Sequence, residues 1–273
     1  MVQEYSFNTG KIELNYAEGG TQGKPVMVFL HGLTGRLQAY TDDFNEYGLD
    51  WHLYAPDLRG HGKSGKPEEG YRLPDYAGDV INFLSEVVGE PVVLVGHSLG
   101  ALVTLTVAHL APDRVRALIA NDPPLLGDDL RIADYPEARG WFSWVYETMK
   151  DQPTFEQVLE RGEAINPEAS QAELQDMAEQ VFGVALGTVK IALDDRQKEG
   201  YDLHAGLRTI DCPAMLLYGD YEDSSVVREK DTAEFRQLVP KAVIHKFEHG
   251  THMLWWEEAE TRKKYVREFL SKI

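Results

Sequence analysis

One short segment constrains the fold of this chain more than any other. The apolar run Pro91–Val95 precedes the pentapeptide Gly96–Gly100 (Gly-His-Ser-Leu-Gly), and a helix-length segment, residues 101–110, follows it. This order predicts a strand, a sharp turn and a helix, because small residues two positions before and after Ser98 let the backbone bend tightly. Such a turn holds the serine hydroxyl clear of its own backbone, near the unpaired N–H groups that open a helix. Ser98 is therefore the candidate nucleophile, whereas the same pattern without its flanking elements would fit a plain glycine-rich turn.

Short apolar runs alternate with helical patterns in the front half of the chain and return near its end. They do not alternate strictly between apolar and polar residues, which is typical of parallel strands covered on both faces. A hairpin formed by Tyr5–Phe7 and Ile12–Tyr16 is expected at the sheet edge, and a helix over Tyr76–Val88. The fold class predicted is α/β, a doubly wound and mostly parallel sheet. Its expected strands are Val26–Leu30, His52–Ala55, Val92–Val95, Val115–Ala120, Ala214–Tyr218 and Ala242–Phe247.

The strand rhythm stops after Pro123-Pro124, and residues 125–205 read as helical. A capping box at Ser170–Glu173, for example, precedes an apolar helical face. We therefore expect a core of residues 1–124 and 206–273 with an inserted helical cap, or lid, of residues 125–205. The segment from Pro123 to Ala205 holds 17 acidic and seven basic residues. This charge should disfavour polyanionic substrates at the entrance.

Composition narrows the class of protein. The 273 residues are 43% hydrophobic, which suffices for one packed core with a smaller attached module. A net charge of −18 argues against nucleic-acid and anionic-membrane partners. The single cysteine, Cys212, excludes an internal disulfide, and neither a signal peptide nor a membrane-spanning apolar run is apparent. The expectation is a cytoplasmic protein that takes a small-molecule substrate, without cofactor or metal and of undetermined oligomeric state.

A serine nucleophile needs a histidine base and a carboxylate that orients it. His252 follows the last predicted strand, so its loop should lie at the same carboxyl edge of the sheet as Ser98. His249 is the nearest rival. Several acids follow the strand Ala214–Tyr218, and Asp223 is favoured as the carboxylate because its spacing to Val226 leaves a short turn before a helix. The distance from Asp223 to His252 is enough for one helix and one strand. Glu222 and, third, Asp122 at the end of an adjacent strand remain alternatives.

The oxyanion of a tetrahedral intermediate needs two N–H donors. Leu99 should supply one from the start of its helix. The second is expected from the glycine-containing loop His31–Gly35, with the Leu33 N–H as the preferred donor. His31 and Gly32 should also border the substrate. Of the aromatic residues in the cap, Trp141 and Trp144 are the candidates for lining an apolar pocket, although they could equally dock the cap on the core.

Four segments together resemble the α/β-hydrolase fold family. They are the pentapeptide at Ser98, His31-Gly32, Gly250-Thr251-His252, and Asp57–Ser64, which reads Asp-Leu-Arg-Gly-His-Gly-Lys-Ser. The resemblance implies a serine esterase-like member with a helical cap and the order nucleophile, acid, base. The family's usual acid position falls on Glu222 here, one residue before Asp223. A serine nucleophile argues against haloalkane dehalogenases and epoxide hydrolases, whose family nucleophile is aspartate.

The leading functional hypothesis is hydrolysis of small to medium carboxylic esters or lactones through an acyl-enzyme. Three alternatives stay open. The same three residues could cleave a carbon–carbon bond or form peracids, and a hydrolase-like pocket could serve as a ligand receptor. A metal site on His245, His249 and His252 would need one continuous helix, which Gly250 interrupts.

Overall fold

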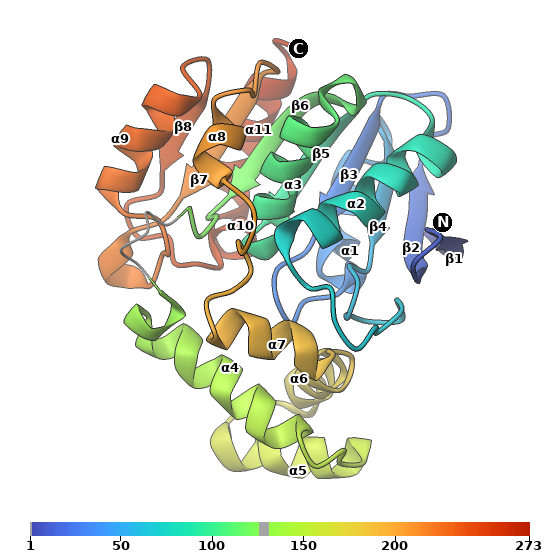
Figure 1. Cartoon of the computed structure of the whole chain (residues 1–273), viewed down its shortest axis with the longest axis vertical. Coiled ribbons are helices and arrows are strands. Elements are labelled where there is room, and N and C mark those ends of the chain that lie inside the picture. Colours follow the sequence, from blue (N-terminus) through green and yellow to red (C-terminus); the bar gives the residue numbers. More distant parts are fainter. Residues whose placement is uncertain (1, 126–130) are drawn as a thin grey trace.

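The computed structural model describes residues 2–125 and 131–273, which form an α/β structure around one sheet (Figure 1). Its strands are β1 Gln3–Asn8, β2 Glu13–Gly20, β3 Val26–Leu30, β4 His52–Pro56, β5 Val92–His97, β6 Val115–Asn121, β7 Ala214–Tyr218 and β8 Val243–Lys246. Its α-helices are α1 Thr41–Tyr47, α2 Leu73–Phe83, α3 Leu99–Leu110, α4 Pro136–Met149, α5 Phe155–Ile165, α6 Gln171–Phe182, α7 Leu186–Leu193, α8 Leu203–Leu207, α9 Glu229–Leu238, α10 Leu254–Glu257 and α11 Ala259–Leu270.

The sheet has eight strands in the order β1-β2-β4-β3-β5-β6-β7-β8. Strand β2 pairs antiparallel with both β1 and β4, and the other neighbouring pairs are parallel. The predicted fold class and the predicted edge hairpin are therefore confirmed. Because the parallel strands all end at one edge, the loops that follow them meet there.

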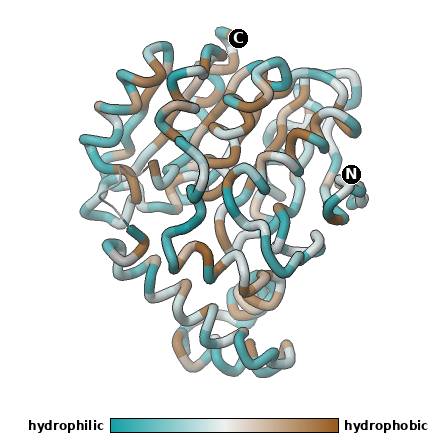
Figure 2. Tube along the Cα trace, in the orientation of Figure 1, coloured by the Kyte–Doolittle hydropathy of each residue, from teal (hydrophilic) through white to brown (hydrophobic). Residues whose placement is uncertain are grey.

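Apolar side chains cover both faces of the sheet, as continuous apolar strands require. One cluster joins the sheet to α2, α3, α8 and α9, and a second joins its other face to α1, α10 and α11. Figure 2 shows hydrophobic positions following the central strands. Near the end of the chain, α10 and α11 are separated at Glu258, whose backbone angles (φ −101°, ψ 35°) are not helical.

Helices α4–α7, here called the inserted helices, lie together beyond the carboxyl edge of the sheet (Figure 1). They bury a small cluster of their own, centred on Val145, Val158 and Val181. Side-chain caps start two of these helices: Thr154 accepts from the Gln157 N–H, and Ser170 accepts from the Glu173 N–H. Among the described residues, no helix combines the length and apolar character needed to cross a membrane.

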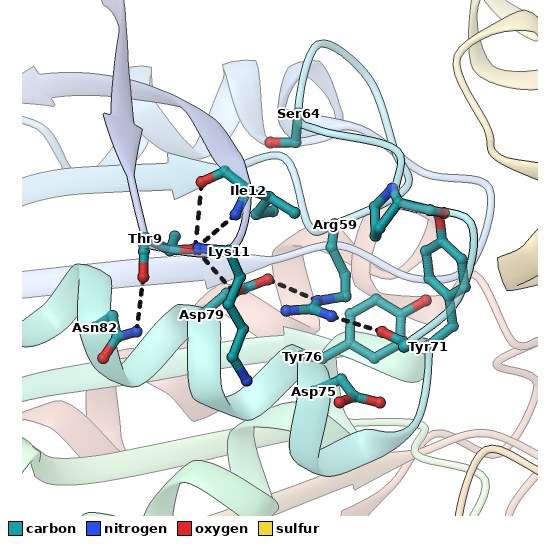
Figure 3. Close-up of polar contacts among 12 residues, drawn as sticks. Thr9, Lys11, Ile12, Arg59, Ser64, Tyr71, Asp75, Tyr76, Asp79 and Asn82 are labelled. Atoms are coloured by element: carbon teal, nitrogen blue, oxygen red, sulfur yellow. Dashed lines mark hydrogen bonds and ion pairs between the residues drawn. The ribbon is translucent and has the colours of Figure 1, made fainter.

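A buried ion pair fixes the segment after β4 to helix α2 (Figure 3). Arg59 Nε donates to Asp79 Oδ2 at 2.7 Å, and both side chains are almost completely buried. Arg59 Nη1 donates to the Gly70 carbonyl at 2.6 Å, and Thr9 Oγ1 donates to the other carboxylate oxygen of Asp79 at 3.1 Å. Buried charges are tolerated when they are paired and hydrogen-bonded in this way. The pair therefore fixes the loop whose Leu58 N–H donates to His31 Nε2.

Candidate active site

Ser98 stands at the sharp turn that the sequence predicts. It has φ 52° and ψ −117° and comes between β5 and the first residue of α3. A Cβ at Gly100 would lie 2.0 Å from the Leu30 carbonyl oxygen, and one at Gly96 would lie 2.3 Å from the Gly100 carbonyl oxygen. Both glycines are therefore required by close backbone approach. A non-glycine residue held at such angles is strained, and strain of this kind is concentrated at functional sites.

His252 is hydrogen-bonded to a buried carboxylate. Its Nδ1 lies 2.6 Å from Asp122 Oδ2, and the Asp122 side chain is completely buried whereas that of His252 is about a quarter exposed. A carboxylate only accepts, so Nδ1 carries the proton and Nε2 is left as the basic nitrogen. This arrangement of histidine and carboxylate is the one that a general base needs.

The carboxylate of Asp122 is held by further donors. Ser225 Oγ donates to its Oδ1 at 2.6 Å, and the Val226 N–H donates to its Oδ2 at 3.0 Å. Asp122 itself has φ 42°, so the chain bends sharply where β6 ends. His97 and Asn121 are paired as the last residues of β5 and β6. Ser98 and Asp122, which follow them, are therefore neighbours at the edge of the sheet. The Ser98 N–H donates to the Asn121 carbonyl at 3.0 Å, which ties the two bends together.

The preference for Asp223 as the carboxylate beside His252 is wrong. Asp223 is exposed, and its Oδ2 lies 3.9 Å from Nδ1 of His249, which is 91% exposed. Glu222 is also exposed. Asp122, the third candidate, takes the position instead, because β6 and β7 end at the same edge and β6 lies next to the strand of Ser98. Ser225, which supports Asp122, was not anticipated, and no feature of its sequence singles it out.

His97 and His31 fix the backbone around Ser98. His97 Nε2 is 2.9 Å from the His252 carbonyl oxygen, and the two rings are 4.6 Å apart. His31 Nδ1 donates to the Gly32 carbonyl at 2.9 Å, while its Nε2 accepts from the Leu58 N–H at 2.9 Å. Both ring nitrogens of His31 are thus used within the protein. His31 borders the cavity described below, but its hydrogen bonds hold the loop rather than a substrate.

A cavity of about 1040 Å³ lies between the sheet edge and the inserted helices. Ser98 and His252 line it, as do the predicted oxyanion residues Leu33 and Leu99 and the predicted substrate-binding residue Gly32. As the first residue of α3, Leu99 has no intrahelical acceptor for its N–H. The other lining residues near α4 are mainly apolar or aromatic: Pro124, Ile132, Tyr135, Ala138, Trp141 and Phe142. Polar and charged lining comes from the loop after Leu33, from α6 and from the segment after α7, and includes Thr34, Arg36, Asp176, Asp194, Asp195, Lys198 and Glu199.

The two predicted tryptophans have different positions. Trp141 lines the cavity, and Trp144 is not among the described residues that do. Trp144 stacks on Trp141 with ring centroids 5.3 Å apart and packs within the cluster of the inserted helices. The prediction that Trp144 contacts substrate is therefore corrected, because its helical position turns it toward the neighbouring helices.

Buried neutral histidines should make the fold acid-sensitive. Burial lowers the pKa of His31 to about 4 and that of His61 to about 3, and it lowers the pKa of His97 well below its usual value. An unfolded histidine binds a proton below about pH 6.5, so the unfolded state binds more protons than the folded state between about pH 6.5 and 4. Stability should be complete above that window and should fall as the pH drops through it. Urea unfolding at pH 7.5, 6 and 5 measures this slope.

A matched variant isolates one of these groups. His61→Gln should flatten the slope by up to about 1.4 kcal/mol per pH unit, the contribution of one proton. Equal stability of the wild type at pH 7.5 and pH 5 would contradict the assignment of neutral buried histidines.

The sharp turn, the histidine–carboxylate pair and the shared cavity define a hydrolase of α/β fold. The chain belongs to the alpha/beta hydrolase family, whose model matches residues 27–264. It is 39% identical over 113 residues to 2-(acetamidomethylene)succinate hydrolase of Mesorhizobium japonicum, a match that covers 41% of this chain and only 40% of that relative. It is 24% identical to N-formylmaleamate deformylase of Pseudomonas putida over 250 residues, 91% of this chain and 89% of that protein.

A solved structure agrees with this fold over the whole chain. The crystal structure of E-2-(acetamidomethylene)succinate hydrolase superimposes with a TM-score of 0.77 at 23% identity, covering 99% of this chain and 100% of that one. At this identity the likeness concerns the fold.

Proposed function

We propose that this protein is a serine hydrolase that cleaves small to medium carboxylic esters or lactones through an acyl-enzyme. The observation that carries the proposal is the 2.6 Å hydrogen bond between His252 and the buried carboxylate of Asp122, beside the strained turn at Ser98. The inserted helices would act as a cap over the cavity. A volume of about 1040 Å³ suits a small-molecule substrate.

In the proposed mechanism, Ser98 Oγ attacks the substrate carbonyl while His252 Nε2 takes the hydroxyl proton. The negative charge that develops on the carbonyl oxygen is held by the Leu33 and Leu99 N–H groups. The tetrahedral intermediate collapses, and the leaving alkoxide receives the proton from His252. Water then gives a proton to His252 as it attacks the acyl carbonyl. The second tetrahedral intermediate releases the acid when His252 returns that proton to Ser98 Oγ.

A second candidate is hydrolysis of an acyl C–N bond by the same residues. It is favoured by the names of two relatives, a hydrolase of 2-(acetamidomethylene)succinate and a deformylase of N-formylmaleamate. The two candidates differ only in the leaving group that His252 must protonate.

The test combines labelling with a substrate panel. A fluorophosphonate should form one covalent adduct, mapped by mass spectrometry to Ser98, and should abolish turnover of p-nitrophenyl esters of graded acyl length. A lactone, an anilide and a vinylogous diketone in the same panel separate ester, C–N and carbon–carbon cleavage. Preferred cleavage of the diketone would replace the ester proposal. Tight ligand binding without turnover or adduct would indicate a receptor.

A further inference from the structure

The loop that carries the proposed oxyanion donor Leu33 contains a strained residue. The Gly35 N–H donates to the Gly32 carbonyl at 3.0 Å, which closes a tight turn over residues 32–35. Thr34, at the third position of this turn, has φ 65°. A β-branched residue is unfavourable at this angle, where glycine or asparagine is usual. Something outside the turn must therefore compensate for a threonine here.

Two of the inserted helices contact this loop directly. Trp141 of α4 donates its Nε1–H to Thr34 Oγ1 at 3.2 Å, and the Thr34 side chain is buried. Arg36, two residues further along, pairs through Nη2 with Asp176 and through Nη1 with Glu179 of α6, both at 2.6 Å. The contacts join the sheet-edge loop to two different helices. They lie within three residues of the Leu33 N–H.

We propose that Trp141 and Arg36 are positioning residues that hold the oxyanion loop in its strained shape. This inference rests on the proposed serine-hydrolase function. Trp141 of α4 holds the turn through its hydrogen bond to the Thr34 hydroxyl. The two ion pairs of Arg36 hold the turn against α6. The helices therefore act on the transition state through the loop, in addition to enclosing the cavity. A donor aimed where charge develops helps only if it is held there before the reaction.

The diagnostic variant is Thr34→Gly. Glycine relieves the unfavourable φ and removes the acceptor of Trp141, so the thermal midpoint should stay equal or rise while kcat falls. Loss of a whole oxyanion donor costs about 100- to 1000-fold in kcat, so a misaligned donor should cost about 10- to 100-fold. KM should change less than about two-fold, because substrate binds before the charge develops. A mere loss of folding stability would lower the midpoint instead.

Trp141→Phe tests the same bond from the other side, since it keeps an aromatic ring in the cavity and removes the donor. Its kcat should fall like that of Thr34→Gly, and the double variant should be no worse than either single one.

Arg36→Gln should lower kcat as well. Binding of a boronic acid, which forms a tetrahedral adduct, should weaken by the same factor as kcat/KM. Tyr146→Phe, a hydroxyl deletion on the same helix α4, is the control and should leave kcat unchanged.

The outcomes separate the two proposals. A wild-type protein that neither hydrolyses esters nor forms the phosphonate adduct would overturn the proposed function. An active wild type with unchanged kcat in folded Thr34→Gly and Trp141→Phe would overturn the positioning role alone. A rise in KM at constant kcat would also overturn it, because it would make these residues substrate contacts.

Discussion

Replacing Asp122 with asparagine should lower kcat/KM for a p-nitrophenyl ester by about 10,000-fold, the loss typical of this change in a serine triad. The asparagine amide would donate to His252 Nδ1, which forces the proton onto Nε2 and removes the base. The side chains have the same shape, and Ser225 Oγ can still donate to the amide oxygen at the Oδ1 position. The Val226 N–H loses its acceptor at the Oδ2 position, which costs about 1 kcal/mol. The fold should therefore survive, as judged by its thermal midpoint.

Asp223→Asn is the matched control for this prediction. Its side chain is half-exposed and lies near His249 rather than His252, so kcat/KM should stay within about two-fold of wild type. A large loss in Asp223→Asn with a normal Asp122→Asn would reverse the assignment of the acid.

Ser98→Ala should abolish measurable turnover, with a loss of about a million-fold in kcat. The substitution removes only the hydroxyl, and alanine bears the same strain at φ 52° as serine, so stability should change little. The residual rate comes from the donors and the cavity, which remain intact. Steady-state kinetics with p-nitrophenyl acetate, together with the unfolding midpoint, measure both parts of the prediction.

A trace of wild-type contaminant would mask such a loss, so the residual activity should be challenged with fluorophosphonate. Activity that persists after this treatment belongs to the variant. Turnover near the wild-type level in Ser98→Ala would exclude this serine as the nucleophile.

Sequence patterns predict the strands of the sheet and the bend at Ser98 well. The strand Ala214–Tyr218 has the predicted bounds. The bend at Ser98 depends on Gly96 and Gly100, where any larger residue would collide with the backbone. These features are local: the periodicity of apolar residues and the positions of small residues determine the conformation of the same segment. The pairing of His252 with a carboxylate depends instead on which strand ends lie side by side.

The proposed acid illustrates the limit of such reasoning. Asp122 and Asp223 both follow strands that end at one edge, so sequence spacing alone does not separate them. The distinction comes from the strand order, which sets β6 beside β5, and from the positive φ of Asp122, which turns its side chain toward His252. An aspartate directly after a buried strand and before Pro123-Pro124 was the available signal. The position of Trp144 was equally hidden, because both sides of α4 carry aromatic rings.

The pairing of Asn121 with His97 has a consequence for how this protein can change. Ser98 and Asp122, the proposed nucleophile and acid, directly follow two paired strands in the middle of the sheet, so their spacing is insulated from movement at its periphery. The short 3-10 turn Tyr221–Asp223 that follows β7 is therefore not needed to supply the acid of the proposed mechanism. It is a place where insertions could reshape substrate choice while the chemistry beneath stays intact.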